Sequence, residues 1–195
     1  MQELIPGISK WTVVEGEHLV PKGAFFVNRP AGSLVVDPVL GREELEAIKA
    51  QGTAKAIVLL TASHVRHTAD FAAELGLPVW ALATVAAKVK ERVKVDRELV
   101  DGEELLDGVK AVEIAVTGEM ALYVPAGAGT VVVADALMAR GAGEISLIPP
   151  NFVPDQEAVK ASLRKLLQYD FGALLVSHGQ GVTTGGREVL QRLLG

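Results

Sequence analysis

A histidine-rich segment directly after an apolar run is the part of this sequence best suited to chemistry. Residues 57–60 read Ile-Val-Leu-Leu, and residues 61–67 read Thr-Ala-Ser-His-Val-Arg-His. The imidazole nitrogens of His64 and His67 are ligands that zinc and iron accept in proteins. The same two histidines could also be ordinary polar residues at the start of a helix, so both interpretations stay open at this point.

Polar side chains follow other apolar runs in the same way. Asp37 follows Leu-Val-Val, Asp135 follows Val-Val-Val-Ala, and Ser177 and His178 follow Leu-Leu-Val. In layered α/β proteins, ligands bind just beyond the carboxyl ends of strands. These positions therefore indicate a site at the strand ends, although a lone aspartate such as Asp135 could equally cap a turn.

A glycine-rich segment before the last expected helix offers a weaker signal. Residues 179–186 read Gly-Gln-Gly-Val-Thr-Thr-Gly-Gly, and a helix N-terminus can bind phosphate. The segment lacks the lysine of a P-loop and the glycine spacing of a dinucleotide site. A plain flexible turn is the favoured interpretation.

The elements that must position these residues alternate along the chain. Runs rich in Val, Ile and Leu between Gly and Pro positions predict strands, and apolar residues at helical spacing predict helices. The expected strands are residues 24–27, 33–37, 54–60, 78–82, 109–115, 121–124, 130–134 and 173–176. The expected helices are residues 42–51, 68–75, 84–92, 155–167 and 188–194. This alternation predicts a layered α/β sandwich with mixed sheets.

Composition limits the classes of protein that the chain can be. A length of 195 residues fits a single domain over 1–195. The net charge of −5 argues against a nucleic-acid partner, and no apolar stretch is long enough to cross a membrane. The start lacks a basic and apolar leader, which predicts a cytoplasmic protein. A small-molecule ligand and a homo-oligomer fit this composition, and His18 is expected at the surface.

The order of these segments resembles the metallo-β-lactamase superfamily. The resemblance covers about residues 24–195 and includes the run to Asp37, the segment 61–67, Thr-Gly-Glu-Met-Ala-Leu-Tyr at 117–123, and the strand ends at Asp135 and His178. It implies an αββα sandwich of two mixed sheets flanked by helices, with a metal cleft. Related hydrolases use one or two Zn or Fe ions to generate hydroxide and to cleave esters, thioesters, amides or phosphodiesters.

The family's metal ligands are only partly retained. Its motif Thr-His-x-His-x-Asp-His falls on residues 61–67, where Ala62 replaces a histidine and Arg66 replaces the aspartate, and a third histidine position falls on Ala115. If Arg66 turns inward, Asp135 is its natural partner and the ion pair would stand in for the metal. Otherwise Arg66 turns outward to solvent. The resemblance leaves as weak or lost metal ligands His64, His67, Asp135 and His178, and as cleft residues Asp37, Ser63, Arg66 and Ser177.

Two functions follow from this resemblance. The leading hypothesis is a degenerate member that lacks the dinuclear hydrolase activity, binds no metal or one weakly held Zn, Fe or Mn ion, and acts in ligand binding or regulation. The alternative is a mononuclear metal-dependent hydrolase of a small ester or thioester, with the metal held by the four remaining ligands. The sequence assigns no catalytic residue, and it leaves open whether the protein is an enzyme.

Overall fold

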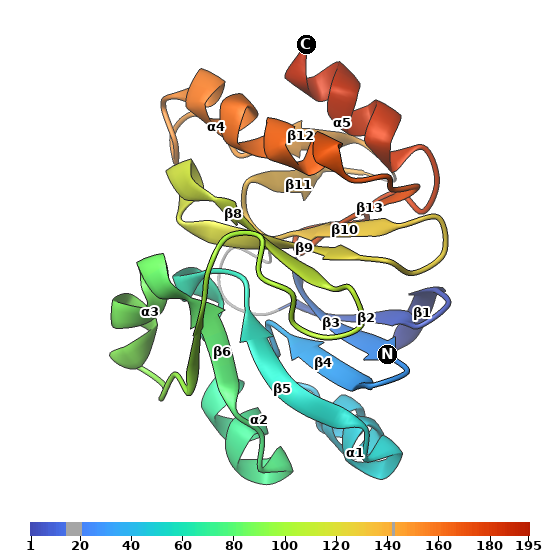
Figure 1. Cartoon of the computed structure of the whole chain (residues 1–195), viewed down its shortest axis with the longest axis vertical. Coiled ribbons are helices and arrows are strands. Elements are labelled where there is room, and N and C mark those ends of the chain that lie inside the picture. The colour runs from blue at the N-terminus through green and yellow to red at the C-terminus, as the bar shows by residue number, and fades with distance from the viewer. Residues whose placement is uncertain (15–20, 142) are drawn as a thin grey trace. The chain divides into compact units, whose positions relative to one another are not determined.

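Two compact units make up the chain, residues 1–100 and residues 101–195. The computed structural model describes residues 1–14, 21–141 and 143–195, and each unit contains its own main sheet (Figure 1). His18 lies outside the described residues. The expectation of a single domain over 1–195 stays a prediction.

The first unit is built on a seven-stranded mixed sheet in which spatial order follows chain order. Strands β1 to β4 pair antiparallel, and β4 to β7 pair parallel. The strands are β1 (Gln2–Ile5), β2 (Ile8–Val14), β3 (Pro21–Arg29), β4 (Gly32–Val36), β5 (Ala54–Leu59), β6 (Val79–Leu82) and β7 (Arg97–Leu99). The carboxyl ends of β4 and β5 therefore meet at one edge of the sheet, and Asp37 and the histidine-rich segment follow them.

Three helices connect the parallel strands of the first unit. They are α1 (Arg42–Gln51), α2 (Thr68–Leu75) and α3 (Ala83–Lys90). Their buried residues Ile48, Phe71 and Val89 pack in one apolar cluster with sheet residues that include Val35 and Ile57. Burial of such side chains contributes about 1.5–3 kcal/mol each. The cluster fixes the helices on one face of the sheet.

The second unit is built on a four-stranded mixed sheet in the order β13-β10-β9-β8. Its strands are β8 (Lys110–Ile114), β9 (Glu119–Val124), β10 (Thr130–Val133) and β13 (Ala173–Val176), and a separate pair consists of β11 (Leu137–Ala139) and β12 (Ile145–Leu147). Strand β10 pairs parallel with β13. Helices α4 (Gln156–Leu163) and α5 (Gly186–Leu194) pack on the core with Val159, Leu163 and Leu190.

Most expected elements are present, and the differences have physical reasons. The expected 24–27 and 33–37 hairpin is β3 and β4, and the expected helix 155–167 is α4 followed by a 3-10 helix, η3 (Arg164–Gln168). Strands β1, β2 and β7 were not expected from the sequence. Neither were β11 and β12, because three-residue strands carry almost no periodic signal.

The glycine-rich segment 179–186 packs against the edge of β13. A Cβ atom at Gly181 would lie 2.4 Å from the carbonyl oxygen of Leu174, and one at Gly186 would lie 2.6 Å from the backbone nitrogen of Leu174. Val182 exchanges two backbone hydrogen bonds with Leu174. Close approach of two backbones explains these glycines, which favours the turn interpretation over a phosphate site.

Membrane-spanning helices were not expected, and the described part of the chain contains no helix with the length and apolar character needed to cross a bilayer.

Candidate metal-ligand residues in the two units

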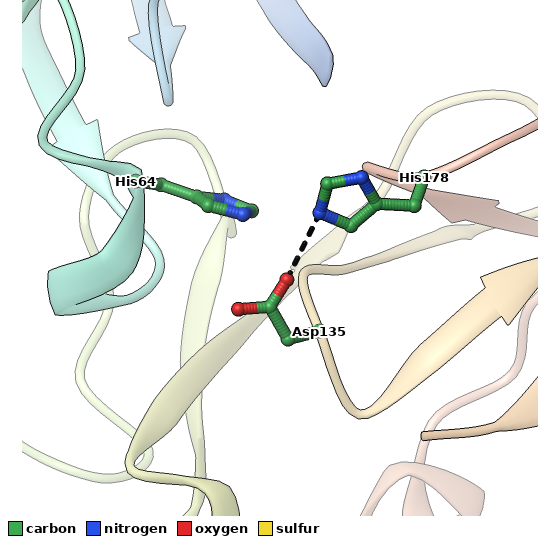
Figure 2. Close-up of side chains that lie close together, drawn as sticks. All are labelled: His64, Asp135 and His178. Carbon is green, nitrogen blue, oxygen red and sulfur yellow. Dashed lines mark hydrogen bonds and ion pairs between the residues drawn. The ribbon is translucent and has the colours of Figure 1, made fainter. Parts of the chain in front are cut away.

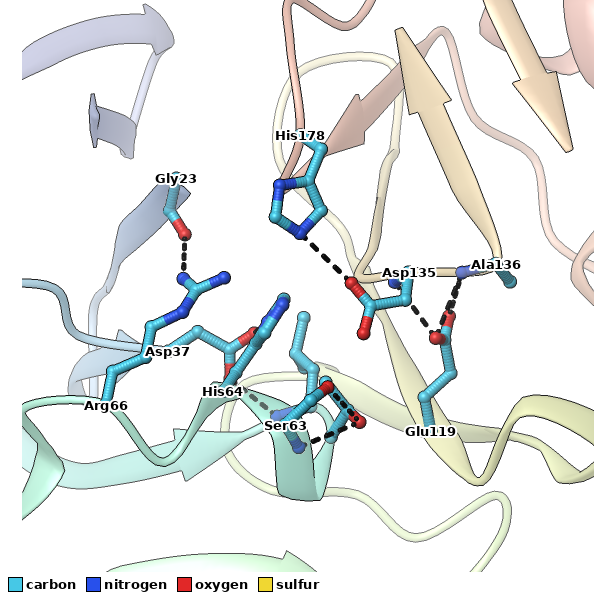
Figure 3. Close-up of polar contacts among 11 residues, drawn as sticks. Gly23, Asp37, Ser63, His64, Arg66, Glu119, Asp135, Ala136 and His178 are labelled. Atoms are coloured by element: carbon cyan, nitrogen blue, oxygen red, sulfur yellow. Dashed lines mark hydrogen bonds and ion pairs between the residues drawn. The ribbon is translucent and has the colours of Figure 1, made fainter. Parts of the chain in front are cut away.

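Asp37 organises the start of the histidine-rich segment in the first unit. It follows β4, is wholly buried, and has a left-handed backbone with φ 48°. Its Oδ1 accepts a hydrogen bond of 2.8 Å from the backbone N–H of Leu60, and its Oδ2 lies 2.6 Å from Nδ1 of His64 (Figure 3). The parallel pairing of β4 with β5 brings these groups together. A single carboxylate thus fixes both the turn and the imidazole.

His64 has the hydrogen-bond partner that a metal-binding histidine commonly has. It lies in a 3-10 helix, η1 (Ala62–His64), and only 3% of it is exposed. An ionised Asp37 can only accept, so Nδ1 carries the proton and the lone pair lies on Nε2. Histidine ligands of metals usually donate their other ring N–H to a carboxylate or carbonyl. With Asp37 ionised, His64 therefore has the tautomer that a metal ligand needs.

His67 has a different hydrogen bond. Its Nδ1 accepts a hydrogen bond of 3.0 Å from the backbone N–H of Leu40, which lies between β4 and α1. A ring nitrogen that accepts uses its lone pair, and the proton of the neutral ring is then on Nε2. In this arrangement His67 ties the segment before α1 to the start of α2.

Arg66 and Ser63 are also held within the first unit. Arg66 has φ 37° and donates from Nη1 to the carbonyl oxygen of Gly23 at 3.1 Å (Figure 3). The Ser63 hydroxyl is 3.1 Å from the hydroxyl of Thr61, and the Thr61 side chain caps the N-terminus of η1. A left-handed backbone costs a non-glycine residue about 1–3 kcal/mol and is often found at functional sites. The expected pairing of Arg66 with Asp135 stays a prediction.

Asp135 and His178 lie together in the second unit. Val133 of β10 pairs with Val176 of β13, so each of the two side chains stands two residues beyond the same pair. Figure 2 shows His178 Nε2 and Asp135 Oδ1 pointing toward each other, and they are 3.1 Å apart. Neither side chain is fully buried, with exposed fractions of 17% for His178 and 27% for Asp135. The parallel register thus places the Asp135 carboxylate and the His178 imidazole next to each other.

Glu119 supports this pair and was not among the predicted site residues. It is wholly buried at the start of β9. Its Oε2 accepts from the backbone N–H of Asp135 at 2.9 Å, and both of its oxygens lie 3.0 Å from the backbone nitrogen of Ala136 (Figure 3). An acidic residue directly before the apolar run of residues 120–122 was the signal that could have identified it.

Ser177 and Ala115 complete the predicted positions. Ser177 is wholly buried, and within the described residues its hydroxyl has no hydrogen-bond partner. Ala115 begins the 3-10 helix η2 (Ala115–Thr117), where its side chain is exposed and has no atom that could bind a metal. Among the predicted ligand positions in the described part of the chain, the side chains that offer nitrogen or oxygen donors suited to Zn or Fe are His64 and His67 in the first unit and Asp135 and His178 in the second.

The family model described as metallo-beta-lactamase superfamily matches residues 2–195. The chain belongs to this superfamily. The match begins well before residue 24, so the superfamily domain also includes β1 and β2, which the sequence resemblance left out. No curated protein sequence matches the chain.

Solved structures of metallo-beta-lactamases resemble the chain over nearly its whole length. The DIM-1 metallo-beta-lactamase has a TM-score of 0.77 at 11% identity, covering 99% of this chain and 95% of that chain. A metallo-beta-lactamase family protein from Thermus thermophilus, TTHA1429, has a TM-score of 0.70 at 18% identity, covering 98% and 79%. TTHA1623, solved in a di-iron-bound form, has a TM-score of 0.67 at 28% identity, covering 91% and 96%. The expected metallo-β-lactamase fold, with two mixed sheets and helices, is confirmed.

Proposed function

We propose that this chain is a superfamily member without a dinuclear metal centre, and that it acts in ligand binding or regulation. Three ligand positions of the family motif are occupied by Ala62, Arg66 and Ala115. None of these side chains binds zinc or iron, and an arginine brings a permanent positive charge. The proposal accordingly expects no metal, or one weakly held Zn, Fe or Mn ion.

The hydrogen bond between Leu40 and His67 is the observation that carries this proposal. The backbone N–H of Leu40 points at Nδ1 of His67 from 3.0 Å. A metal at Nδ1 would displace this N–H, and a metal at Nε2 would need the ring to move its proton to Nδ1, against the Leu40 donor. With His67 engaged, His64, Asp135 and His178 are the ligand-type side chains left. Three protein ligands are the number that a single catalytic zinc uses, which is too few for two ions.

The alternative function is a mononuclear metal-dependent hydrolase of a small ester or thioester. One observation favours it, which is that Asp37 Oδ2 lies 2.6 Å from Nδ1 of His64, so an ionised Asp37 leaves Nε2 for a metal. A bound zinc ion supplies an acidified water and polarises a carbonyl. In this alternative, the metal would be held by the four remaining ligands of the motif, which are His64, His67, Asp135 and His178. His67 would give up its Leu40 hydrogen bond, and Asp37 would keep His64 oriented.

Metal analysis of the purified protein separates the two functions. The protein is purified without chelator, and zinc, iron and manganese are counted per chain by mass spectrometry. The proposal predicts substoichiometric metal and no turnover of small ester and thioester substrates. Two tightly bound ions per chain would contradict it. One tightly bound ion with metal-dependent ester or thioester cleavage would establish the alternative.

The partner and the location belong to the same proposal. We expect a small-molecule ligand, no nucleic acid and no membrane, and a cytoplasmic protein that can form a homo-oligomer. The net charge of −5 supports the absence of nucleic acid. Light scattering on the purified protein would establish the oligomeric state, and a gel-shift assay with duplex DNA and RNA would detect a nucleic-acid partner.

A further inference from the structure

A buried carboxylate lies behind the Asp135–His178 pair, and neither function above uses it. Glu119 is wholly buried and accepts hydrogen bonds from two consecutive backbone N–H groups, those of Asp135 and Ala136. Burial of a carboxylate is costly unless its oxygens have donors. The hydrogen bonds donated by these two N–H groups therefore stabilise the buried Glu119 carboxylate.

The sheet register explains why Glu119 is the residue that reaches them. Strands β9 and β10 pair antiparallel up to Leu122 opposite Val132. The same register continued by three residues, past the end of β10 at Val133, would bring Glu119 opposite Asp135. The ladder between β9 and β10 ends before that point, so backbone groups of β9 no longer pair with this part of the chain. Beyond the last backbone pair, the Glu119 side chain accepts the backbone N–H groups of Asp135 and Ala136.

We propose that Glu119 is a positioning residue that fixes the backbone of Asp135 and thereby holds its carboxylate against His178. Two hydrogen bonds to consecutive peptide groups restrict the peptide planes on both sides of the Asp135 Cα atom. Those planes set the direction in which the Asp135 side chain leaves the chain. The proposal rests on the proposed function only where zinc binding is used as a readout.

The exposure of the pair supports this division of roles. Side chains that are 27% and 17% exposed, as in Asp135 and His178, are partly solvated, and ion pairs open to solvent contribute little to holding a geometry. The contact between the two side chains is therefore a weak restraint by itself. The restraint from the wholly buried Glu119 is the stronger one, because breaking it would leave two backbone N–H groups without acceptors.

The test replaces Glu119 with glutamine. Glu119→Gln keeps the size of the side chain but turns one acceptor oxygen into an NH₂ donor, which cannot accept from an N–H group. The matched control is Glu104→Gln. Glu104 also accepts a backbone N–H, that of Gly108 at 3.1 Å, but it lies at the surface of the same unit and pairs with Lys110.

Two measurements report the position of the Asp135 carboxylate relative to His178, and not only the stability of the fold. Long-range ¹H–¹⁵N spectra at about pH 8, where an ordinary imidazole is neutral, give the tautomer of His178, and calorimetry of the full-length chain gives its zinc affinity. In the parent we expect the Nε2–H tautomer, which donates to an ionised Asp135. Glu119→Gln should give a mixture of tautomers and about a tenfold loss of zinc affinity, and Glu104→Gln should change neither.

A folded Glu119→Gln variant with the parent's tautomer and zinc affinity would overturn the proposal. If this variant does not fold, the parent itself decides through scalar couplings across the hydrogen bonds, from the amide nitrogens of Asp135 and Ala136 to the Glu119 carboxyl carbon. Absence of both couplings would also overturn it. Two tightly bound ions in the parent would contradict the proposed function alone, because the tautomer of His178 would still test Glu119.

Discussion

The histidine-rich segment of the first unit and the Asp135–His178 pair of the second unit are built alike but differ in what their side chains do. Each follows the carboxyl ends of neighbouring parallel strands, and each is held by a buried acid, Asp37 or Glu119. In the first unit the acid contacts the imidazole of His64 directly. In the second unit the acid holds backbone, and the ligand-type side chains contact each other.

If this chain has lost a metal centre, as we propose, this difference indicates which side chains found another role. In the segment 61–67, His67 accepts a backbone N–H and Arg66 donates to a backbone carbonyl, so these side chains tie loops together. Such roles keep the residues useful for stability without a metal. In the second unit, the hydrogen bond between Asp135 and His178 joins two ligand-type side chains to each other and not to backbone groups, so a metal there would displace only a contact between its own ligands.

The largest expected effect is the loss of stability on removing Asp37. Asp37→Ala would leave the buried N–H of Leu60 and the buried ring of His64 without their acceptor, and we expect a loss of roughly 3 kcal/mol in the free energy of unfolding. Asp135→Ala removes a partly exposed carboxylate and should cost less than about 1 kcal/mol. Urea denaturation followed by circular dichroism measures both. Equal losses would remove the distinction between the two regions.

Zinc binding should separate His67 from His178. His178→Ala is expected to lower zinc affinity by at least about tenfold, whereas His67→Ala should leave zinc affinity unchanged and reduce stability by about 1 kcal/mol through the lost Leu40 hydrogen bond. Calorimetric zinc titration and urea denaturation provide the two numbers. A large loss of zinc affinity in His67→Ala would show that His67 is a ligand after all.

The contribution of the Arg66 side chain can be separated from its backbone strain. Arg66→Gly relieves a left-handed φ of 37° but removes the hydrogen bond to the carbonyl oxygen of Gly23. We expect Arg66→Gly to lose about 1 kcal/mol in the free energy of unfolding, measured by urea denaturation. If Arg66→Gly is as stable as the parent, the side chain contributes no net stability, and the hypothesis that it compensates for a lost metal fails.

The smallest expected effect is a pH dependence that arises from Asp96 in the first unit. The hydrogen bond from Lys94, followed by that from the Val79 N–H, lowers the pKa of Asp96 below its usual 3.8. Because the folded pKa is depressed, the stabilisation is present above about pH 4 and is lost as the pH falls through the folded pKa. Asp96→Asn should therefore lower the urea midpoint at pH 6 more than at pH 2. An equal change at both pH values would contradict this assignment.

The fold, and the placement of candidate site residues at strand ends, could be predicted from the sequence because both depend on local patterns. The polar residues after apolar strands marked Asp37, His64, Asp135 and His178, and the parallel pairing of β10 with β13 then placed the last two together. Strand-end chemistry is visible in a sequence because it needs only the end of an apolar run and the next few residues.

The remaining features depend on contacts between distant segments. The hydrogen bond from Leu40 to His67 joins residues 27 positions apart, and no spacing rule indicates which histidine nitrogen meets a backbone N–H. The acidic residue before the apolar run of residues 120–122 marks Glu119 as a residue at a strand start, but its backbone donors at Asp135 and Ala136 follow only from the pairing of β9 with β10. Neither contact is visible in the spacing of the ligand motif, so the motif alone does not show which groups its side chains meet.

The most direct test of the account is to rebuild the lost ligands. Ala62→His with Arg66→Asp restores the family motif at residues 61–67, beside a His64 that already has its supporting carboxylate. Calorimetric zinc titration of the parent and the double variant should show weak binding in the parent and a rise in affinity of at least about 100-fold, close to 2.7 kcal/mol, in the variant. A double variant that binds zinc no better than the parent would contradict the assignment of this segment to a degenerate metal site.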